Sequence, residues 1–211
     1  MNSIREAYDN WSAKYDSDTN LTRDVDRIVT QETLADFNCN LIAEIGCGTG
    51  KNTSFLSQIG SKVQAIDFSH AMLNKAKEKL NSNNVTFSVC DITEKWSFSD
   101  RSVDLVTCNL VLEHIQDLSF IFSEADRVLT DGGVLFISEL HPFKQYLGAK
   151  ANFEKSERIV KIPSFVHHIS DFFNAAKNNS FIIEDFQEWW HETDTNKPPR
   201  LISFTFKKQQ E

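Results

Sequence analysis

Several features are missing from this sequence, and each absence argues against a class of protein. No apolar run approaches the roughly 20 residues that a membrane-spanning helix needs, and the first residues, MNSIREAYDN, lack the apolar stretch of a signal peptide. The four cysteines, Cys39, Cys47, Cys90 and Cys108, form no C-x-x-C pair, so neither a zinc site nor a disulfide framework is indicated. We therefore expect no membrane span, no metal site and a cytoplasmic location.

The sequence also lacks a basic stripe. Its 22 Lys and Arg residues are outnumbered by 30 Asp and Glu residues, which gives a formal net charge of −8. Because affinity for nucleic acid comes largely from phosphate contacts, such a chain is a poor candidate for binding DNA or RNA. Residues 144–161 carry a local excess of lysine and arginine, which fits either a solvated surface or an anionic small substrate.

What the sequence does contain is an alternation of strand-like and helix-like segments. Its 211 residues suit a single domain, 1–211, without repeats. Short links between the segments predict a parallel α/β sheet covered by helices on both faces, and Pro198-Pro199 between the last two strands predicts a closing antiparallel hairpin. The expected strands are 41–46, 62–67, 84–90, 102–109, 134–140, 180–187 and 200–207. The expected helices are 1–20, 21–37, 51–59, 69–80, 117–129 and 169–176.

A glycine-rich loop follows the first expected strand, in the stretch LIAEIGCGTGKN. Gly46, Gly48 and Gly50 allow a sharp turn and let a ligand lie against bare main chain, next to the unpaired N–H groups of a helix start. A phosphate-binding P-loop needs four residues between its glycines, whereas only three separate Gly46 from Gly50. A dinucleotide fingerprint fits poorly, because Lys51 stands where its third glycine belongs. We expect a nucleotide-like ligand at this loop.

Polar residues also end the next three strands, at the edge of a parallel sheet where ligands bind. Asp67 ends the second strand, within about 20 residues of the glycine loop, where an acidic residue can accept hydrogen bonds from ribose hydroxyls. Asp91 and Ile92 end the third strand and could hold the edge and the face of an adenine ring. Asn109 ends the fourth strand.

Jointly these segments resemble motifs I to V of the class I S-adenosylmethionine-dependent methyltransferases, in particular the small-molecule branch that includes the ubiquinone and menaquinone methyltransferases. The resemblance rests on Glu44–Lys51, VQAIDFSHAML, CDI, VDLVTCNLVLEHIQD and RVLTDGGVLFISE. It implies a Rossmann-like, seven-stranded sheet of order 3-2-1-4-5-7-6 with strand 7 antiparallel. It also implies S-adenosyl-L-methionine as cofactor and in-line transfer of its methyl group to an O, N or C nucleophile of a small molecule.

The same resemblance implies a set of site residues. Residues 1–20 would form a lid helix that brings Tyr8 and Tyr15 over the cofactor, and 142–166 would be an inserted substrate cover. Phe68 and Met72 would lie beside the adenine, although both are equally compatible with plain core positions. The implied cofactor-binding residues are Tyr15, Glu44, Gly46, Cys47, Gly48, Gly50, Asp67, Phe68, Met72, Asp91, Ile92 and Asn109.

The sequence says less about catalysis. Holding the two reactants in near-attack geometry supplies roughly 7–11 kcal/mol, against about 3–5 kcal/mol from a general base, so an enzyme of this class can lack an obvious base. The candidate bases are His114, Glu139, His141 and His168.

Two questions stay open at this point. The aromatic residues and lysines of 142–166 leave the acceptor either apolar or anionic, and nothing indicates an oligomeric state. The alternative function is a cofactor-binding domain that has lost catalysis and serves as a partner or regulatory protein. A nucleotide-dependent oxidoreductase is disfavoured by Lys51 and the missing third glycine.

Overall fold

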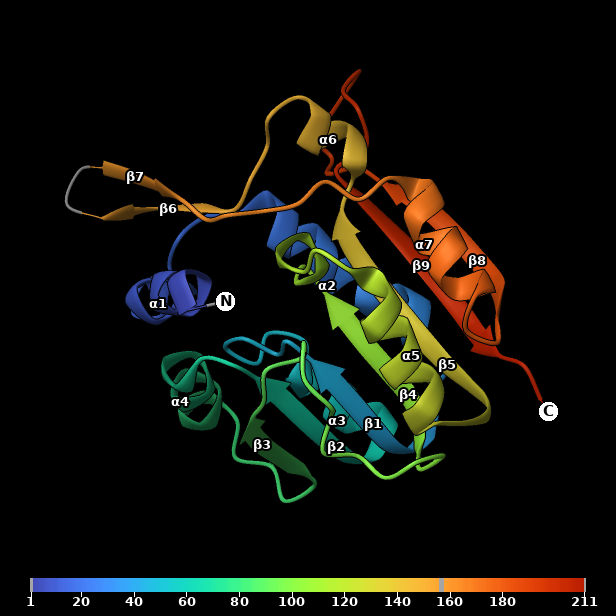
Figure 1. The fold of residues 1–211 in the computed structure, drawn as a ribbon. Coiled ribbons are helices and arrows are strands. Elements are labelled where there is room, and N and C mark those ends of the chain that lie inside the picture. The colour runs from blue at the N-terminus through green and yellow to red at the C-terminus, as the bar shows by residue number, and fades with distance from the viewer. Residues whose placement is uncertain (1, 156–157, 211) are drawn as a thin grey trace.

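Seven strands form the sheet that runs through the protein: β1 (Cys39–Ile45), β2 (Gly60–Asp67), β3 (Val85–Val89), β4 (Val103–Asn109), β5 (Leu129–Leu140), β8 (Phe181–Trp189) and β9 (Leu201–Lys208). The computed structural model describes residues 2–155 and 158–210. The strand order is β3-β2-β1-β4-β5-β9-β8, and β9 runs antiparallel to both β5 and β8 while the other pairs are parallel (Figure 1). This confirms the predicted order 3-2-1-4-5-7-6 and its antiparallel last strand.

Helices cover both faces of this sheet, as predicted. They are α1 (Asn2–Trp11), α2 (Leu21–Leu34), α3 (Thr53–Ile59), α4 (His70–Lys79), the 3₁₀ turn η1 (Leu112–His114), α5 (Leu118–Val128), α6 (Pro142–Tyr146) and α7 (Ile169–Lys177). One core cluster joins α2 and α3 to the sheet through Val29 and Leu56, and a second joins α5 and α7 through Phe122 and Phe172. Within the described residues, no helix has the length and apolar character that crossing a bilayer requires.

The two central strands are buried on both faces, which explains their near-continuous apolar sequence. In β1, Ile42, Ala43 and Ile45 have at most 1 % of their surface exposed, and in β4 Leu105 and Val106 are fully buried. A parallel strand between two helical layers has no solvent-facing side, so alternation of polar and apolar residues is lost. The carboxyl ends of these strands therefore emerge side by side at one edge of a rigid core.

The N-terminal segment differs from its prediction. The helix predicted over 1–20 ends at Trp11, and Tyr15 lies in the turns that follow. The Trp11 indole N–H donates to Asp18 at 2.8 Å, which closes these turns. Asn20 then caps α2, because its side-chain oxygen accepts from the main-chain N–H groups of Thr22 and Arg23.

The segment 142–166 contains α6 and a separate two-stranded sheet, β6 (Asn152–Lys155) and β7 (Arg158–Lys161), whose strands the sequence had not indicated. Figure 1 shows this hairpin projecting from the main sheet on the side of α1. Phe153 of β6 stacks on Trp11 of α1, with ring centroids 5.4 Å apart and ring planes 15° apart. Ile4 and Ile162 are buried in the same cluster. The N-terminal helix and the inserted segment thus share a small apolar core of their own.

We expect Phe204→Ala to destabilise the fold severely. Phe204 is fully buried in β9 and lies 4.8 Å from Phe172, 5.3 Å from Phe186 and 5.5 Å from Phe206 between ring centroids. Removing such a ring leaves a cavity and should lower the free energy of unfolding in urea by about 3–5 kcal/mol. Phe143→Ala, at a side chain 48 % exposed, is the matched control and should cost under about 0.5 kcal/mol. Equal losses in both variants would contradict this account of the core.

Candidate functional site

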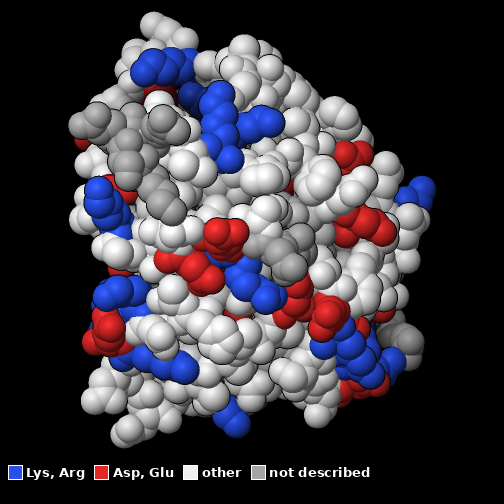
Figure 2. All heavy atoms as spheres, turned by 60° about the vertical axis from the view of Figure 1, so that its left-hand side comes forward, with Lys and Arg blue, Asp and Glu red and all other residues white. Residues whose placement is uncertain are grey.

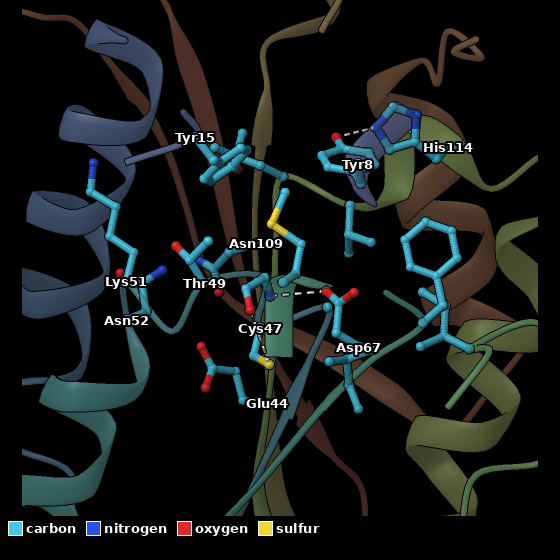
Figure 3. A pocket seen from close by; sticks show the side chains of 18 of the residues that line it. Tyr8, Tyr15, Glu44, Cys47, Thr49, Lys51, Asn52, Asp67, Asn109 and His114 are labelled. Atoms are coloured by element: carbon cyan, nitrogen blue, oxygen red, sulfur yellow. Dashed lines mark hydrogen bonds between the residues drawn. The ribbon is translucent and has the colours of Figure 1, made fainter. Parts of the chain in front are cut away.

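A pocket opens at the carboxyl ends of the parallel strands, beneath the N-terminal segment (Figure 3). It encloses about 950 Å³ of empty space, its open mouth included. The predicted cofactor residues that line it are Tyr15, Glu44, Gly46, Cys47, Gly48, Asp67, Phe68, Met72, Asp91, Ile92 and Asn109. Residues predicted from four separate strand ends therefore meet at one pocket.

The glycine loop adopts a backbone that other residues rarely take. Gly46, Gly48 and Gly50 have φ angles of +72°, +54° and +77°. Nothing lies within 4 Å of the position that a Cβ would take at Gly48, so bare main chain borders open space there. Gly50 is not among the lining residues; a Cβ there would stand 3.1 Å from the Cβ of Ala76, so this glycine lets α4 pack closely against the loop.

The carboxyl group of Asp67 ties the glycine loop to the end of β2. One oxygen accepts from the Gly48 N–H at 2.9 Å and the other from the Ser69 N–H at 2.8 Å. Burial raises the pKa of Asp67 to about 6, and the two main-chain donors oppose part of that rise. An ionised carboxyl group has about four lone-pair sites, so Asp67 keeps acceptor capacity toward the pocket.

Glu44 and Asp91 differ in exposure and in their hydrogen-bond partners. Glu44 is buried and accepts from the Thr53 hydroxyl at 2.6 Å, and burial raises its pKa to about 8, so it is largely uncharged near neutral pH. Asp91 is partly exposed, accepts from the Thr93 hydroxyl at 2.7 Å and lies 3.7 Å from the Arg5 guanidinium.

A hydrogen-bonded group beside the pocket centres on Asp26, which the sequence analysis missed. Its carboxyl oxygens accept from the Asn52 amide at 2.9 Å and from the Asn109 amide at 2.8 Å, and Asn109 also donates to Thr30 at 2.9 Å. Burial raises the pKa of Asp26. Asp26 and Thr30 lie one turn apart on α2, and this polar i, i+4 pair beside an apolar stripe was the available signal. It fixes the Asn109 side chain, leaving the backbone of that residue to border the pocket.

Arg23 is a second residue that the sequence did not single out. Only 6 % of its surface is exposed; its guanidinium donates to the main-chain oxygens of Tyr15 and Asp18 and lies 4.0 Å from the Tyr15 ring centroid. Its Nε is buried without a hydrogen-bond partner among the described residues, and the side chain lines the pocket. A buried cation with an unused donor is costly unless a ligand pairs with it.

Tyr8 and His114 form a hydrogen-bonded pair in the pocket wall, 2.7 Å between the phenol oxygen and Nε2 (Figure 3). His114 Nδ1 lies 2.8 Å from the main-chain oxygen of Pro163, which can only accept, so Nδ1 carries the proton. Nε2 is then the acceptor, and the Tyr8 hydroxyl donates to it. Burial lowers the pKa of His114, which keeps the ring neutral near neutral pH, and raises the pKa of Tyr8 well above its usual value.

Further polar contacts hold the N-terminal segment over the pocket. The Ser69 hydroxyl donates to Asp9 at 2.5 Å, and the Thr49 hydroxyl donates to Asp16 at 2.7 Å. The Lys79 ammonium also pairs with Asp16 at 2.7 Å. Ser69 and Thr49 both lie close to the glycine loop and Asp67, so the N-terminal segment is bonded to the residues that shape the pocket.

Comparison with known proteins identifies this arrangement. A family model described as a methyltransferase domain matches residues 43–137. A malonyl-[acyl-carrier protein] O-methyltransferase of Hamiltonella defensa is 31 % identical over 138 residues, which are 65 % of this chain and 52 % of that protein. A ubiquinone biosynthesis O-methyltransferase of Xanthomonas oryzae is 29 % identical over 173 residues, 78 % of this chain and 71 % of that protein.

Residues 43–137 thus match a methyltransferase domain, and both relatives are named as methyltransferases. A putative S-adenosylmethionine-dependent methyltransferase from Listeria monocytogenes shares the fold with a TM-score of 0.76 at 19 % identity, over 89 % of this chain and 100 % of that one. The complex of DhpI with SAH gives the same TM-score and identity over 100 % and 97 %. The chain thus spans about half the length of the Hamiltonella relative.

Of the four predicted candidate bases, His114 lines the pocket and the other three have partners elsewhere in the described structure. Glu139 is buried and accepts from the main-chain N–H groups of Val111 and Leu112 at 2.8 and 2.7 Å. The other two histidines lie at helix starts. His141 caps α6, and its Nε2 lies 2.8 Å from Oε1 of Glu188. His168 precedes α7, and its Nδ1 lies 2.6 Å from the Tyr146 hydroxyl.

We expect Glu139→Gln to flatten the dependence of stability on pH. Burial raises the pKa of Glu139 from 4.5 to about 8, so the folded state holds this proton more tightly than the unfolded state does. Its stabilising contribution is complete below pH 4.5 and is lost as pH rises toward 8. The glutamine oxygen can accept the same two N–H bonds and never ionises.

Thermal unfolding between pH 5 and 8.5 measures this effect. The wild-type protein should lose several degrees more than Glu139→Gln over that range. Glu184→Gln, at a partly exposed carboxylate paired with Lys207, should behave like the wild type. Parallel curves for the wild type and Glu139→Gln would contradict the assigned pKa shift.

Proposed function

We propose that this chain transfers a methyl group from S-adenosyl-L-methionine to a nucleophilic atom of a small molecule. The observation that supports this most directly is that the glycine loop, Asp67, Asp91 with Ile92, and Asn109 all line one pocket. Each comes from the end of a different strand, so their meeting at one site follows from the fold and not from their spacing in the sequence.

The residues present fit this cofactor. The unused acceptor capacity of Asp67 suits a ribose diol, and Asp91 with Ile92 suits the edge and face of adenine, with Phe68 and Met72 beside it. The orphan Nε of Arg23 suits the carboxylate of the methionine end. The bare main chain at Gly48 allows close approach. We therefore assign cofactor binding to these residues together with Tyr15, Glu44, Gly46 and Cys47; Gly50 acts through packing.

The bound cofactor supplies a sulfonium methyl group that is already activated. The protein holds the reactants and excludes water, because the N-terminal segment covers the pocket. Tyr8 and His114 provide a route for the proton that an O–H or N–H nucleophile loses. That proton can pass to the Tyr8 oxygen while the phenol proton moves to His114 Nε2, already 2.7 Å away. Such a transfer contributes typically about 10²–10⁴-fold.

The relatives bear on the atom that is methylated. The relatives reported above are both named as O-methyltransferases, which favours an oxygen nucleophile for this chain. The aromatic walls supplied by Tyr8 and Trp11 suit an apolar acceptor, and Lys150 in the same chamber suits an anionic one.

We expect Asp67→Ala to weaken cofactor binding by roughly 10- to 150-fold, the equivalent of about 1.5–3 kcal/mol for a hydrogen bond to a charged group. Calorimetric titration with S-adenosylhomocysteine measures the loss, and NAD should not bind at all. Asp185→Ala, at an exposed carboxylate of β8, is the control and should bind normally. Normal affinity in Asp67→Ala would overturn the ribose assignment, and binding of NAD instead would overturn the proposed function.

We expect Tyr8→Phe to slow methyl transfer by about 10²-fold or more while leaving the affinity for S-adenosylhomocysteine within a few-fold of normal. Turnover is measured with labelled cofactor and the small-molecule fraction of a cell extract. Tyr146→Phe is a matched control, because this tyrosine also pairs with a histidine, His168, but does so outside the pocket.

The double variant Tyr8→Phe, His114→Ala should lose little more than the worse single variant, because the two residues act as one unit. Additive losses would contradict a shared proton route. Cofactor binding without any methyl transfer in the wild type would instead support a binding or regulatory role.

A further inference from the structure

A second chamber adjoins the cofactor pocket on the side of the inserted segment. It encloses about 860 Å³ of empty space, its open mouth included, and is bounded by α1, the start of α2, the end of β5 and residues 149–152. Tyr8, Tyr15, Arg23 and Leu110 line both this chamber and the cofactor pocket. The two hollows are therefore neighbours, and Tyr8 forms part of the wall between them.

The charge of this chamber is opposite to that of the cofactor pocket. Its charged lining residues within the described structure are Arg23, Lys150, Arg200 and Glu113. Figure 2 shows lysine and arginine side chains gathered near the top of the lid side of the molecule, toward the inserted segment, whereas acidic and basic side chains are interspersed below. Of the basic residues in 144–161, Lys150 lines this chamber, where it joins Arg23 and Arg200.

Arg200 and Lys150 differ in how firmly each is held by other residues. Asp194 accepts from Nε and Nη2 of Arg200, both at 2.7 Å, and Nη1 of Arg200 reaches Thr22 at 3.3 Å. This clamp fixes the guanidinium in the chamber wall. Lys150 is exposed, and no ion pair engages its ammonium group within the described residues. The Arg200 guanidinium is therefore held in place, whereas the Lys150 side chain can move to contact a ligand.

Glu113 is a buried acidic residue in the wall of this chamber. Only 6 % of this residue is exposed, yet its Oε2 has no hydrogen-bond partner among the described residues. Burial raises the pKa of Glu113 to about 7, so near neutral pH much of the group carries a proton. A protonated carboxyl group can donate that proton in a hydrogen bond to an anionic ligand.

We propose that this chamber is the acceptor site and that the acceptor carries a carboxylate or phosphate group, held between Lys150 and Arg200, with its nucleophile directed at Tyr8. The proposal rests on the proposed methyltransferase function and names its class of substrate. A purely apolar acceptor would take the Lys150 ammonium group out of water without pairing it, which is unfavourable. An anion can pair with Lys150 and Arg200 and can accept a hydrogen bond from the protonated carboxyl group of Glu113.

Binding of simple anions tests this directly. Inorganic phosphate and succinate are titrated by calorimetry into the protein saturated with S-adenosylhomocysteine, so that Arg23 in the cofactor pocket is already occupied. Succinamide, the neutral analogue of succinate, is the ligand control. Lys150→Gln changes an exposed side chain that lines the chamber, and Lys161→Gln changes an exposed lysine of the same segment that does not line it.

Saturable binding of at least one anion is expected, about tenfold or more weaker in Lys150→Gln and unchanged in Lys161→Gln. Tighter binding of phosphate would indicate a phosphorylated acceptor, and tighter binding of succinate a carboxylate. The proposal is overturned if neither anion binds, if succinamide binds as well as succinate, or if Lys150→Gln binds like the wild type. If S-adenosylhomocysteine itself fails to bind, it is the methyltransferase function that fails.

Discussion

The carboxyl group of Asp67 is the constraint on which the rest of the site depends. It accepts from Gly48 and from Ser69, and so joins the glycine loop to the start of α4. Ser69 in turn caps α4 by accepting from Met72 and donates its hydroxyl to Asp9 of the N-terminal helix. A single buried carboxyl group thus links the loop, the helix that follows β2 and the lid. Its position is fixed before any ligand arrives, which is the preorganisation that a binding site requires.

The distribution of charge separates the two halves of the site. Carboxyl groups border the cofactor pocket, where Asp26 and Asp67 are buried side chains with raised pKa values. S-adenosylmethionine carries a sulfonium and an ammonium group, so an acidic pocket complements it. Lysine and arginine dominate the neighbouring chamber. Tyr8, neutral because burial raises its pKa, stands at the junction of the two. We therefore propose that the two chambers select ligands of opposite charge, with the uncharged Tyr8 between them.

The sheet and the cofactor pocket could be predicted because both follow from local patterns. Apolar periodicity gave the strands, and the carboxyl ends of parallel strands share one edge, so residues at those ends had to converge. Pairings between distant segments carried no such signal. Tyr8 and His114 are 106 positions apart, and Asp26 and Asn109 are 83 apart. Glu139 also lies near the end of a strand, but its carboxyl oxygen accepts a hydrogen bond from the turn after β4. Its position at a strand end does not reveal this contact. Residues 142–166 lack a clear hydrophobic periodicity, so the hairpin of β6 and β7 was not predicted.

The division of labour between the lid and the sheet has an evolutionary consequence. The groups assigned to hold the cofactor lie mostly in and after the strands, whereas Tyr8 comes from a ten-residue helix at the other end of the chain. Affinity and reactivity are thus encoded in separate stretches of sequence. Substitutions confined to the first helix could silence the chemistry and leave a competent cofactor sensor behind. Exchange of residues 149–152 could redirect the enzyme to a new acceptor without disturbing the fold, so this architecture can diversify one module at a time.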